Sequence, residues 1–246
     1  KTDLEILSNC IKSIDHLVSI NLVENSREFK NKDLIKKINP KINFFCTGEN
    51  LGYSGGNNFG LEQTKTRYAL ILNPDTICAP NFFENIKKYI NGDVNFSIIG
   101  AQYNNDSTWQ THGFFDEKKN SNNQYDQNNL IKTEWVMGCS MLIDLNKFEK
   151  KNLFDTNFFL FFEEFDLCKQ VVKTGGKVFS SKSLLIDHLG FKGSFGSKKE
   201  FEIYALKIKN WHFMWSFFYY HKKNDGYFFA LKKSFGRLLR SILKTF

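Results

Sequence analysis

The sequence predicts an α/β protein with a mostly parallel central sheet flanked by helices. Over residues 1–101, short apolar runs typical of strands alternate with segments of helical periodicity, a pattern that favours parallel strands joined by helical crossovers. The chain of 246 residues is 41% hydrophobic and contains only 3 prolines. It can therefore bury a sizeable core, and its composition argues against a disordered chain.

Four strands are predicted in this first part, at residues 18–23, 42–46, 68–72 and 96–101. Helices are predicted around them, at residues 4–17, 33–38 and 81–90. A further helix is expected to follow a glycine- and asparagine-rich loop, Asn50–Asn58.

Beyond this part the alternation ends. Residues 103–130 are rich in Asn, Gln, Asp and Lys, which predicts an exposed hairpin or loop. A strand at 135–143, a helix at 163–174 and two short strands around Lys182 are then expected. We predict a main domain over residues 1–194, with halves at about 1–101 and 102–194, and a helical, aromatic and basic C-terminal extension over 195–246.

The formal net charge of +8 and the pI near 9.1 favour anionic partners, such as nucleotides, nucleic acids or acidic membranes. No zinc-finger or RNP-like pattern is present, so we expect no nucleic-acid partner. The 5 cysteines form no CxxC pair, which argues against a zinc cluster or a disulfide framework and favours a reducing cytoplasm. The longest aromatic run near the end of the chain is too short to span a bilayer.

A carboxylate follows the predicted strand at 68–72, in the run Asn73-Pro74-Asp75. Pro74 removes a backbone donor and ends the strand, so we expect Asp75 beyond the strand's carboxyl end, where open α/β sheets bind ligands. There it can bind a divalent cation, and the cation can bind a diphosphate. A simple turn after a core strand is the alternative.

The glycine-rich loop contains Gly52, Gly55 and Gly56 and precedes a predicted helix. Glycines let the backbone approach a ligand closely, and the N-terminus of a helix favours negative charge. The spacing matches neither a Walker motif nor a dinucleotide-binding motif. A flexible entry into the helix is the alternative.

Acidic residues crowd the first turn of the helix predicted at 163–174, directly after the apolar run Phe158–Phe162. Glu163, Glu164 and Asp166 can complement the helix dipole. At the rim of an apolar cluster they can instead have raised pKa values, which suits a metal ligand or a general base. His188 precedes a glycine-bearing loop, a setting for phosphate or metal binding, although a lone histidine is usually structural.

Several motifs occur in a distinctive order: Glu24-Asn25-Ser26, NLGYSGGNNFG, LNPD, WVMGCSML, FFLFFEEFDLC and the loop after His188. Together they resemble the family 2 glycosyltransferases, most closely their rhamnosyltransferase-like bacterial branch, over residues 1 to about 200. The resemblance implies a GT-A fold, in which a Rossmann-like nucleotide-binding half merges with an acceptor-binding half. It also implies inverting, Mg²⁺- or Mn²⁺-dependent transfer of a sugar from a nucleotide diphosphate donor to a saccharide or lipid-linked saccharide, in the synthesis of a cell-surface polysaccharide or lipopolysaccharide.

The resemblance assigns roles by motif position. Asp75 matches the metal-binding acid, His188 the histidine near metal and diphosphate, and Glu164 the catalytic base. The residues implied to contact the nucleotide are Glu24, Asn25, Ser26, Gly52, Gly55, Gly56, Asn57 and Asn73. Those implied to contact the acceptor are Trp135, Gly138, Glu163 and Asp166, with a core position as the alternative for Trp135.

Two positions depart from the family pattern, because Glu24 and Glu164 stand where the family has shorter aspartates. A misplaced base can cost about 100-fold in rate. The family's opening strand is also missing before Lys1, which predicts that the sequence is part of a longer protein. The alternative function is therefore a catalytically impaired relative that acts as a binding or scaffold subunit.

The C-terminal extension places Leu231, Phe235, Leu238, Leu239 and Ile242 at helical spacing among Lys and Arg residues. Such a basic amphipathic helix favours peripheral contact with an anionic membrane, here the inner face of the cell membrane. A helical cap on the domain, or an oligomer contact, is the alternative.

Overall fold

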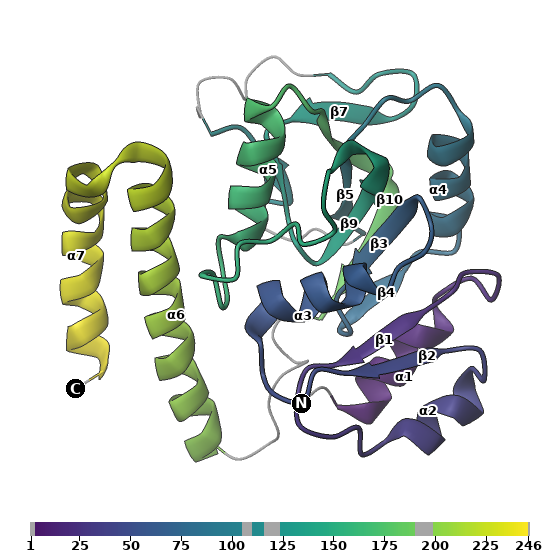
Figure 1. The fold of residues 1–246 in the computed structure, drawn as a ribbon, viewed down its shortest axis with the longest axis horizontal. Helices are drawn as coiled ribbons and strands as arrows, with labels where there is room; N and C mark the ends of the chain where they lie inside the picture. The colour runs from purple at the N-terminus through teal and green to yellow at the C-terminus, as the bar shows by residue number, and fades with distance from the viewer. Residues whose placement is uncertain (1–2, 105–109, 116–123, 190–198, 246) are drawn as a thin grey trace.

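The computed structural model describes residues 3–104, 110–115, 124–189 and 199–245 (Figure 1). The α/β prediction is confirmed, and a six-stranded sheet forms the centre of the fold. Its strands lie in the order β3-β9-β5-β10-β4, and β7 also pairs with β10. Their bounds are β3 (Tyr68–Leu72), β4 (Thr76–Cys78), β5 (Ile98–Tyr103), β7 (Leu130–Thr133), β9 (Ser140–Asp144) and β10 (Val178–His188).

Strands β3, β5 and β10 run in one direction, with β9 antiparallel between β3 and β5. β10 is one strand of 11 residues where the sequence predicts two short ones. Its pairing with β5 shifts between Ser181 and Leu185, so a local irregularity at Lys182 breaks the apolar pattern without ending the strand.

The strand predicted at 135–143 also differs, because it divides at a turn. β8 (Trp135–Val136) pairs with β6 (His112–Gly113), and β9 begins after a turn at Gly138 and Cys139. Of the segment predicted as an exposed hairpin or loop, the described residues form the end of β5, β6 and the approach to β7; the remainder lies outside the described residues.

Helices cover both faces of the central sheet (Figure 1). α4 (Phe82–Asn91) packs into the core cluster that contains Ile99, and α5 (Glu163–Lys173) into the one that contains Ile98. Because successive strand residues point to opposite faces, these neighbours in β5 divide between the two cores. A short 3-10 turn, η2 (Leu145–Lys147), follows β9.

A smaller parallel sheet lies beside the central one. It pairs β1 (Asn21–Glu24) with β2 (Asn43–Cys46). Two short helices, α1 (Leu4–Lys12) and α2 (Lys32–Ile38), form a separate apolar cluster with it around Ile11, Ile35 and Ile42.

The glycine-rich segment is helical rather than a loop: α3 (Gly52–Glu62) begins at its first glycine. A Cβ at Gly56 would lie 2.9 Å from the Asn25 side-chain nitrogen, and one at Gly60 would lie 3.1 Å from Val23. The prediction of a loop over Asn50–Asn58 was wrong for this physical reason: these glycines let the helix approach β1 closely and do not prevent helix formation.

The C-terminal residues form a helical hairpin, α6 (Lys199–Asp225) and α7 (Tyr227–Thr245), at the left of Figure 1. Gly226 joins the helices with a φ of +99°, a conformation that favours glycine. The helical prediction is thus confirmed over the described part of the extension. Among the described helices, none is both long and apolar enough to span a membrane.

Candidate active site

Asp75 lies in the tight connection between β3 and β4, beyond the carboxyl end of β3 as the sequence predicts. β4 pairs antiparallel with the end of β10, which places Thr76 opposite His188. The buried Asp75 carboxylate is 3.3 Å from His188 Nε2, and its backbone carbonyl accepts a hydrogen bond from Leu189. The sheet register therefore brings together two residues that are far apart in the sequence.

Tyr103, at the end of β5, fixes the orientation of His188. Its hydroxyl is 3.3 Å from His188 Nδ1, and the two rings stack with their centroids 5.7 Å apart. A partner on one ring nitrogen of a histidine leaves the other nitrogen directed at a ligand, as in many metal sites. Sequence reasoning missed Tyr103, because its alignment with His188 depends on how β5 pairs with β10.

The Asp75–His188 pair fits a divalent cation that shares a diphosphate. It presents one carboxylate and one imidazole nitrogen side by side. In the part of the chain that the structure describes, no cluster of three or more His, Cys, Asp or Glu residues could hold a metal by itself. A cation here would take its remaining ligands from phosphate oxygens and water, as Mg²⁺ commonly does.

Glu163 and Glu164 begin α5, and both side chains are buried, at 5% and 9% exposure. One carboxylate oxygen of each, Oε2, has no hydrogen-bond partner among the residues that the structure describes. Burial raises the pKa of Glu164 to about 7; burial and the neighbouring Glu164 raise the pKa of Glu163 well above its usual value. A carboxylate that ionises near neutral pH suits a general base.

The backbone before α5 is unusual. Phe161 and Phe162 both have positive φ angles, 71° and 67°, although neither is a glycine. Such conformations are uncommon for bulky residues and persist only where surrounding contacts impose them. Here the Phe162 ring contacts three aromatic rings of α6, those of Phe213, Phe217 and Tyr220.

Asp75 and Glu164 both lie near Cys139. The pKa of the Cys139 thiol is raised to about 12, mainly by burial and in part by the carboxylates of Glu164 and Asp75. The pKa of Tyr103 is raised by burial and by its contact with Cys139, and again by both carboxylates. Since such influence falls off with distance, both acids lie near Cys139 and Tyr103.

Gly138 lies against Glu164. Its carbonyl accepts a hydrogen bond from the hydroxyl of Tyr53, and a Cβ at Gly138 would lie 3.5 Å from the Cβ of Glu164. Trp135 packs against Phe165, with ring centroids 4.8 Å apart, and is only partly buried. Asn73, just before Asp75, donates its backbone N–H to the carbonyl of Cys139 at 2.9 Å.

The segment expected to contact the nucleotide is organised by Asn25. Its side chain donates to the carbonyl of Gly52 at 2.7 Å and accepts from the backbone N–H of Leu51 at 3.0 Å. Glu24 and Ser26 flank it at the end of β1, while Asn57 donates to the carbonyl of Tyr53 within α3. Gly55 packs closely against Leu51. These contacts fix the N-terminus of α3 beside the end of β1.

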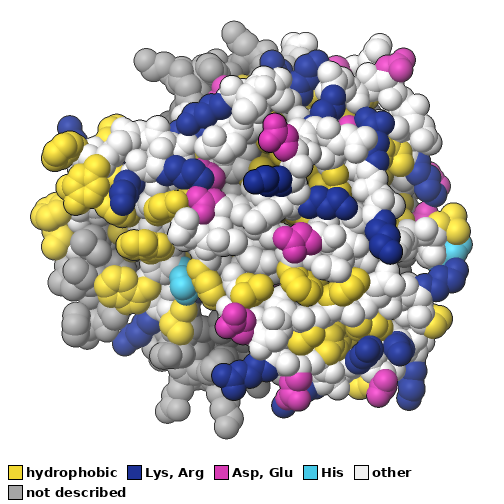
Figure 2. All heavy atoms as spheres, in the orientation of Figure 1, with side chains coloured by type: hydrophobic (Ala, Val, Ile, Leu, Met, Phe, Trp, Pro, Cys, Tyr) yellow, Lys and Arg dark blue, Asp and Glu magenta, His cyan; other side chains and the backbone are white. Residues whose placement is uncertain are grey.

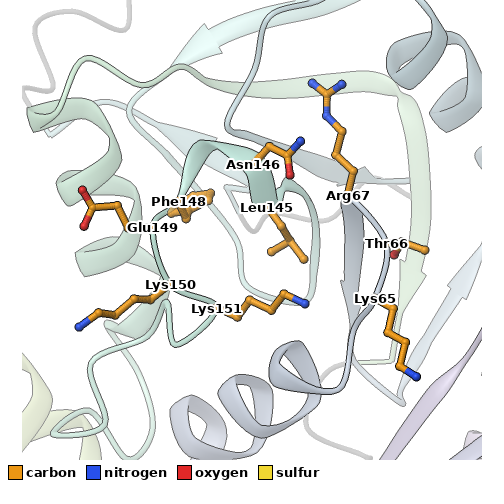
Figure 3. A pocket seen from close by; sticks show the side chains of 9 residues that line it. All are labelled: Lys65, Thr66, Arg67, Leu145, Asn146, Phe148, Glu149, Lys150 and Lys151. Carbon is orange, nitrogen blue, oxygen red and sulfur yellow. The ribbon is translucent and has the colours of Figure 1, made fainter.

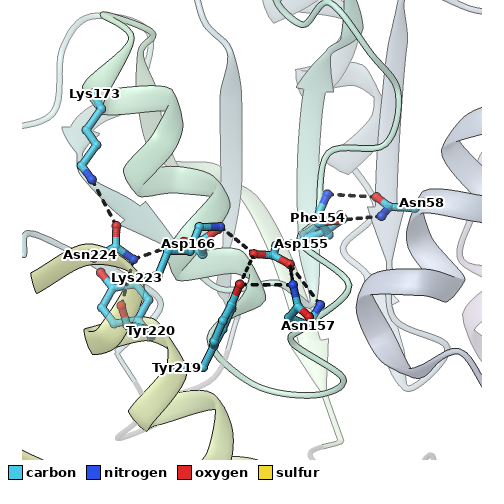
Figure 4. A network of polar contacts seen from close by, with 10 residues as sticks. All are labelled: Asn58, Phe154, Asp155, Asn157, Asp166, Lys173, Tyr219, Tyr220, Lys223 and Asn224. Carbon is cyan, nitrogen blue, oxygen red and sulfur yellow. Dashed lines mark hydrogen bonds and ion pairs between the residues drawn. The ribbon is translucent and has the colours of Figure 1, made fainter. Parts of the chain in front are cut away.

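Asp166 points toward α6 (Figure 4). Its carboxylate accepts hydrogen bonds from Lys223 at 2.7 Å and from Asn224 at 3.2 Å. Lys223 also pairs with Asp155 at 2.7 Å. The structure therefore gives Asp166 a role in joining α5 to the hairpin.

A second residue absent from the sequence predictions is Lys209 of α6. Burial lowers its pKa, and the nearby Asp75 carboxylate partly offsets this effect. Lys209 thus brings a positive charge toward Asp75 from a helix near the other end of the chain. Its distance from Asp75 in the sequence left no local signal for this proximity.

A separate basic hollow lies elsewhere, at the opposite end of β3 (Figure 3). It has a volume of about 620 Å³ and is lined by Lys65, Thr66, Arg67, Leu145, Asn146, Phe148, Glu149, Lys150 and Lys151. Arg67 is held by a bidentate contact with Asp144. Because these residues precede β3 or follow β9, the hollow is not part of the Asp75 site.

The family profile described as "Glycosyl transferase family 2" matches residues 5–161. The chain belongs to glycosyltransferase family 2. The low-salt glycan biosynthesis hexosyltransferase Agl10 of Haloferax volcanii is 26% identical to this family member over 183 residues, which are 67% of this chain and 56% of that protein.

Two solved structures show a GT-A-type fold like that of this family 2 chain. GalNAc-T7 with UDP, GalNAc and Mn²⁺ has a TM-score of 0.58 at 12% identity and covers 89% of this chain. The mannosyltransferase PcManGT of Pyrobaculum calidifontis, with GDP-Man and Mn²⁺, has a TM-score of 0.59 at 10% identity and covers 98% of this chain. The matched regions amount to 47% of the GalNAc-T7 chain and 72% of PcManGT, so this chain spans about half the length of Agl10 and of GalNAc-T7.

Proposed function

We propose that this protein is an inverting glycosyltransferase that moves a sugar, with rhamnose as one candidate, from a nucleotide diphosphate donor to a saccharide or lipid-linked saccharide. The observation that carries the proposal is that both acids lie beside the turn at Gly138 and Cys139. Glu164 lies against Gly138, and Asn73, two residues before Asp75, donates its backbone N–H to the carbonyl of Cys139. An inverting displacement needs a carboxylate to remove the acceptor's proton, together with positive charge at the departing diphosphate.

The chain's own residues divide these tasks. Glu164 has a pKa of about 7 and one oxygen without a partner among the described residues, and it takes the proton from the acceptor hydroxyl. Asp75 and His188 would hold a Mg²⁺ or Mn²⁺ ion, which when bound neutralises charge on the diphosphate. Lys209 adds a positive charge near Asp75. Both solved relatives contain Mn²⁺, which supports this choice of cation.

Binding follows from the surrounding elements. Asn25 and the start of α3, including Gly52, Gly55 and Gly56, form the nucleotide side together with Glu24, Ser26, Asn57 and Asn73. Trp135, Gly138 and Glu163 form the acceptor side, where a partly exposed aromatic ring suits a sugar. We place the reaction at the cytoplasmic face of the cell membrane, in the synthesis of a surface polysaccharide or lipopolysaccharide. The free state of all five thiols, Cys10, Cys46, Cys78, Cys139 and Cys168, supports a reducing compartment.

The test is a donor-hydrolysis and transfer assay with UDP-, dTDP- and GDP-sugars and Mn²⁺. We expect Asp75→Ala and Glu164→Ala to abolish turnover, while Asp33→Ala and Glu149→Ala, at exposed positions away from the site, keep it. Turnover that survives both site changes would refute the assignment. Donor binding without turnover by the wild type would instead favour the alternative, a catalytically impaired scaffold subunit.

A further inference from the structure

The helical hairpin carries an exposed apolar surface on both of its helices. On α6, Trp211 and Trp215 lie one turn apart and are exposed, Trp215 at 57%. On α7, Phe228 is 85% exposed and Phe235 is 66% exposed. Figure 2 shows apolar side chains gathered at the left of the molecule, where Figure 1 places the hairpin, with Lys and Arg among them.

Aromatic contacts make this surface continuous across the hairpin. The Trp215 ring contacts Phe218 with centroids 6.4 Å apart, Phe218 contacts Tyr227 at 6.1 Å, and Tyr227 contacts Phe228 at 5.8 Å. The stripe therefore passes from α6 through the turn into α7. Exposed apolar surface of this extent on a folded protein marks an interaction site. We call it the hairpin surface: Trp211, Trp215, Phe218, Tyr227, Phe228, Leu231, Phe235 and Leu239.

The charge of the hairpin indicates which kind of partner the hairpin surface binds. The 19 residues of α7 include five Lys or Arg residues and no Asp or Glu. Lys222, Lys232, Lys233 and Arg237 are exposed along the hairpin. A second copy of this chain would bring the same positive helix against itself, which is repulsive, whereas an anionic bilayer complements it. Trp and Tyr rings with interleaved Lys and Arg are typical of helices that lie in the membrane interface.

The inner face of the hairpin is already occupied by the catalytic domain. Phe213, Phe217 and Tyr220 of α6 contact Phe162 next to Glu163, and Ser216 donates to the carbonyl of Leu160 at 2.8 Å. A bilayer on the outer face would consequently lie at a fixed orientation to the start of α5.

We propose that the hairpin surface docks this protein on anionic phospholipid, with the aromatic side chains in the interface and the lysines on lipid phosphates. This proposal rests on the proposed function in one respect: docking would bring the site to a lipid-linked acceptor. The docking itself depends on no catalytic residue.

Sedimentation with phosphatidylcholine vesicles, with and without phosphatidylglycerol, tests the proposal on the full chain. We expect binding to the anionic vesicles alone, accompanied by a blue shift of tryptophan fluorescence. Phe228→Ser with Phe235→Ser should weaken binding at least about tenfold, and Lys232→Glu with Lys233→Glu at least about 25-fold. The control for charge is Lys36→Glu with Lys37→Glu, an exposed adjacent pair on α2; Leu17→Ser at an exposed site is the control for the apolar change.

Three results would overturn the proposal. The first is that the wild type does not bind anionic vesicles. The second is that the charge reversal on α2 weakens binding as much as the charge reversal on α7. The third is a dimer in sedimentation equilibrium that Phe228→Ser with Phe235→Ser dissociates, since the surface would then bind a second copy. Hydrolysis of a soluble donor without vesicles should stay at the wild-type rate in all hairpin-surface variants, so loss of docking and failure of the proposed catalysis are separate readouts.

Discussion

Two sets of carboxylates lie on or beside α5, all buried except the partly buried Asp155, and they differ in how they are compensated. Within the described part of the chain, Glu163 and Glu164 each keep one buried oxygen without a partner, and the pKa of both is raised, mainly by burial. Asp166 and Asp155 instead share the ammonium of Lys223 (Figure 4). Burial alone would raise the pKa of Asp155, yet its hydrogen bonds with Lys223 and Asn157 lower it overall.

This difference distinguishes acids that stabilise the fold from acids that are available for catalysis. A buried ionised group without a partner destabilises the folded state, and it persists where its reactivity is used. A buried acid with a good partner has little reactivity left and serves to hold elements together. One helix of this protein therefore carries both kinds of acid within a single turn.

The largest expected effect is on catalysis. Glu164→Gln should lower the transfer rate by about 10²–10⁴-fold, the usual contribution of a general base. Because the change removes a poorly compensated charge, the midpoint of thermal unfolding at pH 8 should not fall. Initial rates at saturating donor, with Glu149→Gln as the control, measure the first effect. A rate within tenfold of the wild type would place the base elsewhere.

The next effect is on stability. Lys223→Met leaves Asp166 buried without its cation, so the free energy of unfolding should fall by about 3 kcal/mol, near the lower limit for breaking a buried pair because Lys223 is partly exposed. Urea denaturation measures it. Lys222→Met, at the adjacent exposed lysine, should change stability by less than about 0.5 kcal/mol. Equal effects of the two changes would mean that the ion pairs contribute nothing.

The free energy of unfolding should depend on pH with opposite sign in the two sets of acids. Between the usual pKa of 4.5 and about 7, folded Glu164 keeps a proton that the unfolded chain has released. Its contribution to stability is therefore present below pH 4.5 and is lost as the pH rises toward 7, by up to about 1.4 kcal/mol per pH unit. Asp155, with a lowered pKa, loses its contribution in the opposite direction, as the pH falls through its folded pKa.

Urea denaturation across this pH range tests the sign. In Glu164→Gln the decline between pH 4.5 and 7 should become smaller, while in Lys223→Met it should remain. An unchanged decline in Glu164→Gln would assign the titration to another group, with Glu163 the first candidate.

The smallest expected effect is on the Asp75 site. There the carboxylate lies beside His188, which is charged only when it is protonated. Tyr103→Phe removes the hydroxyl that lies 3.3 Å from His188 but keeps the ring stack. We expect a loss of about 0.5–1.5 kcal/mol in Mn²⁺-dependent binding of a nucleoside diphosphate, measured by calorimetry. Tyr227→Phe, on the exposed turn of the hairpin, should bind like the wild type. No change in Tyr103→Phe would mean that His188 needs no orienting partner.

The sequence is sufficient to predict what ends an element locally. Pro74 and Asp75 mark the end of β3, and Gly175 marks the end of α5, because these signals act within a few residues. The glycines of α3 led to a wrong prediction, because what requires them is a close tertiary contact with Asn25 and Val23. Likewise, β10 continues through its irregularity because β5 pairs with it on both sides of the register shift.

The candidate site shows the same limit. Asp75, Glu164 and His188 are recognisable from their motifs, and their roles stay predictions until tested. Tyr103 and Lys209 approach them only through the register of the sheet and the packing of α6, which no local pattern encodes. The partner of Asp166 was hidden for the same reason, because Lys223 lies 57 residues further along the chain, on α6.

Phe161 and Phe162, with their positive φ angles, limit how far the chain can be shortened from its C-terminal end without loss of activity. Their conformation depends on rings supplied by α6, so a chain cut before Phe213 would let the start of α5 relax into a commoner geometry and carry Glu164 with it. A chain cut at Gly226 keeps those rings. Limited proteolysis or expression trials should accordingly find a functional boundary between the two helices of the hairpin, not ahead of both.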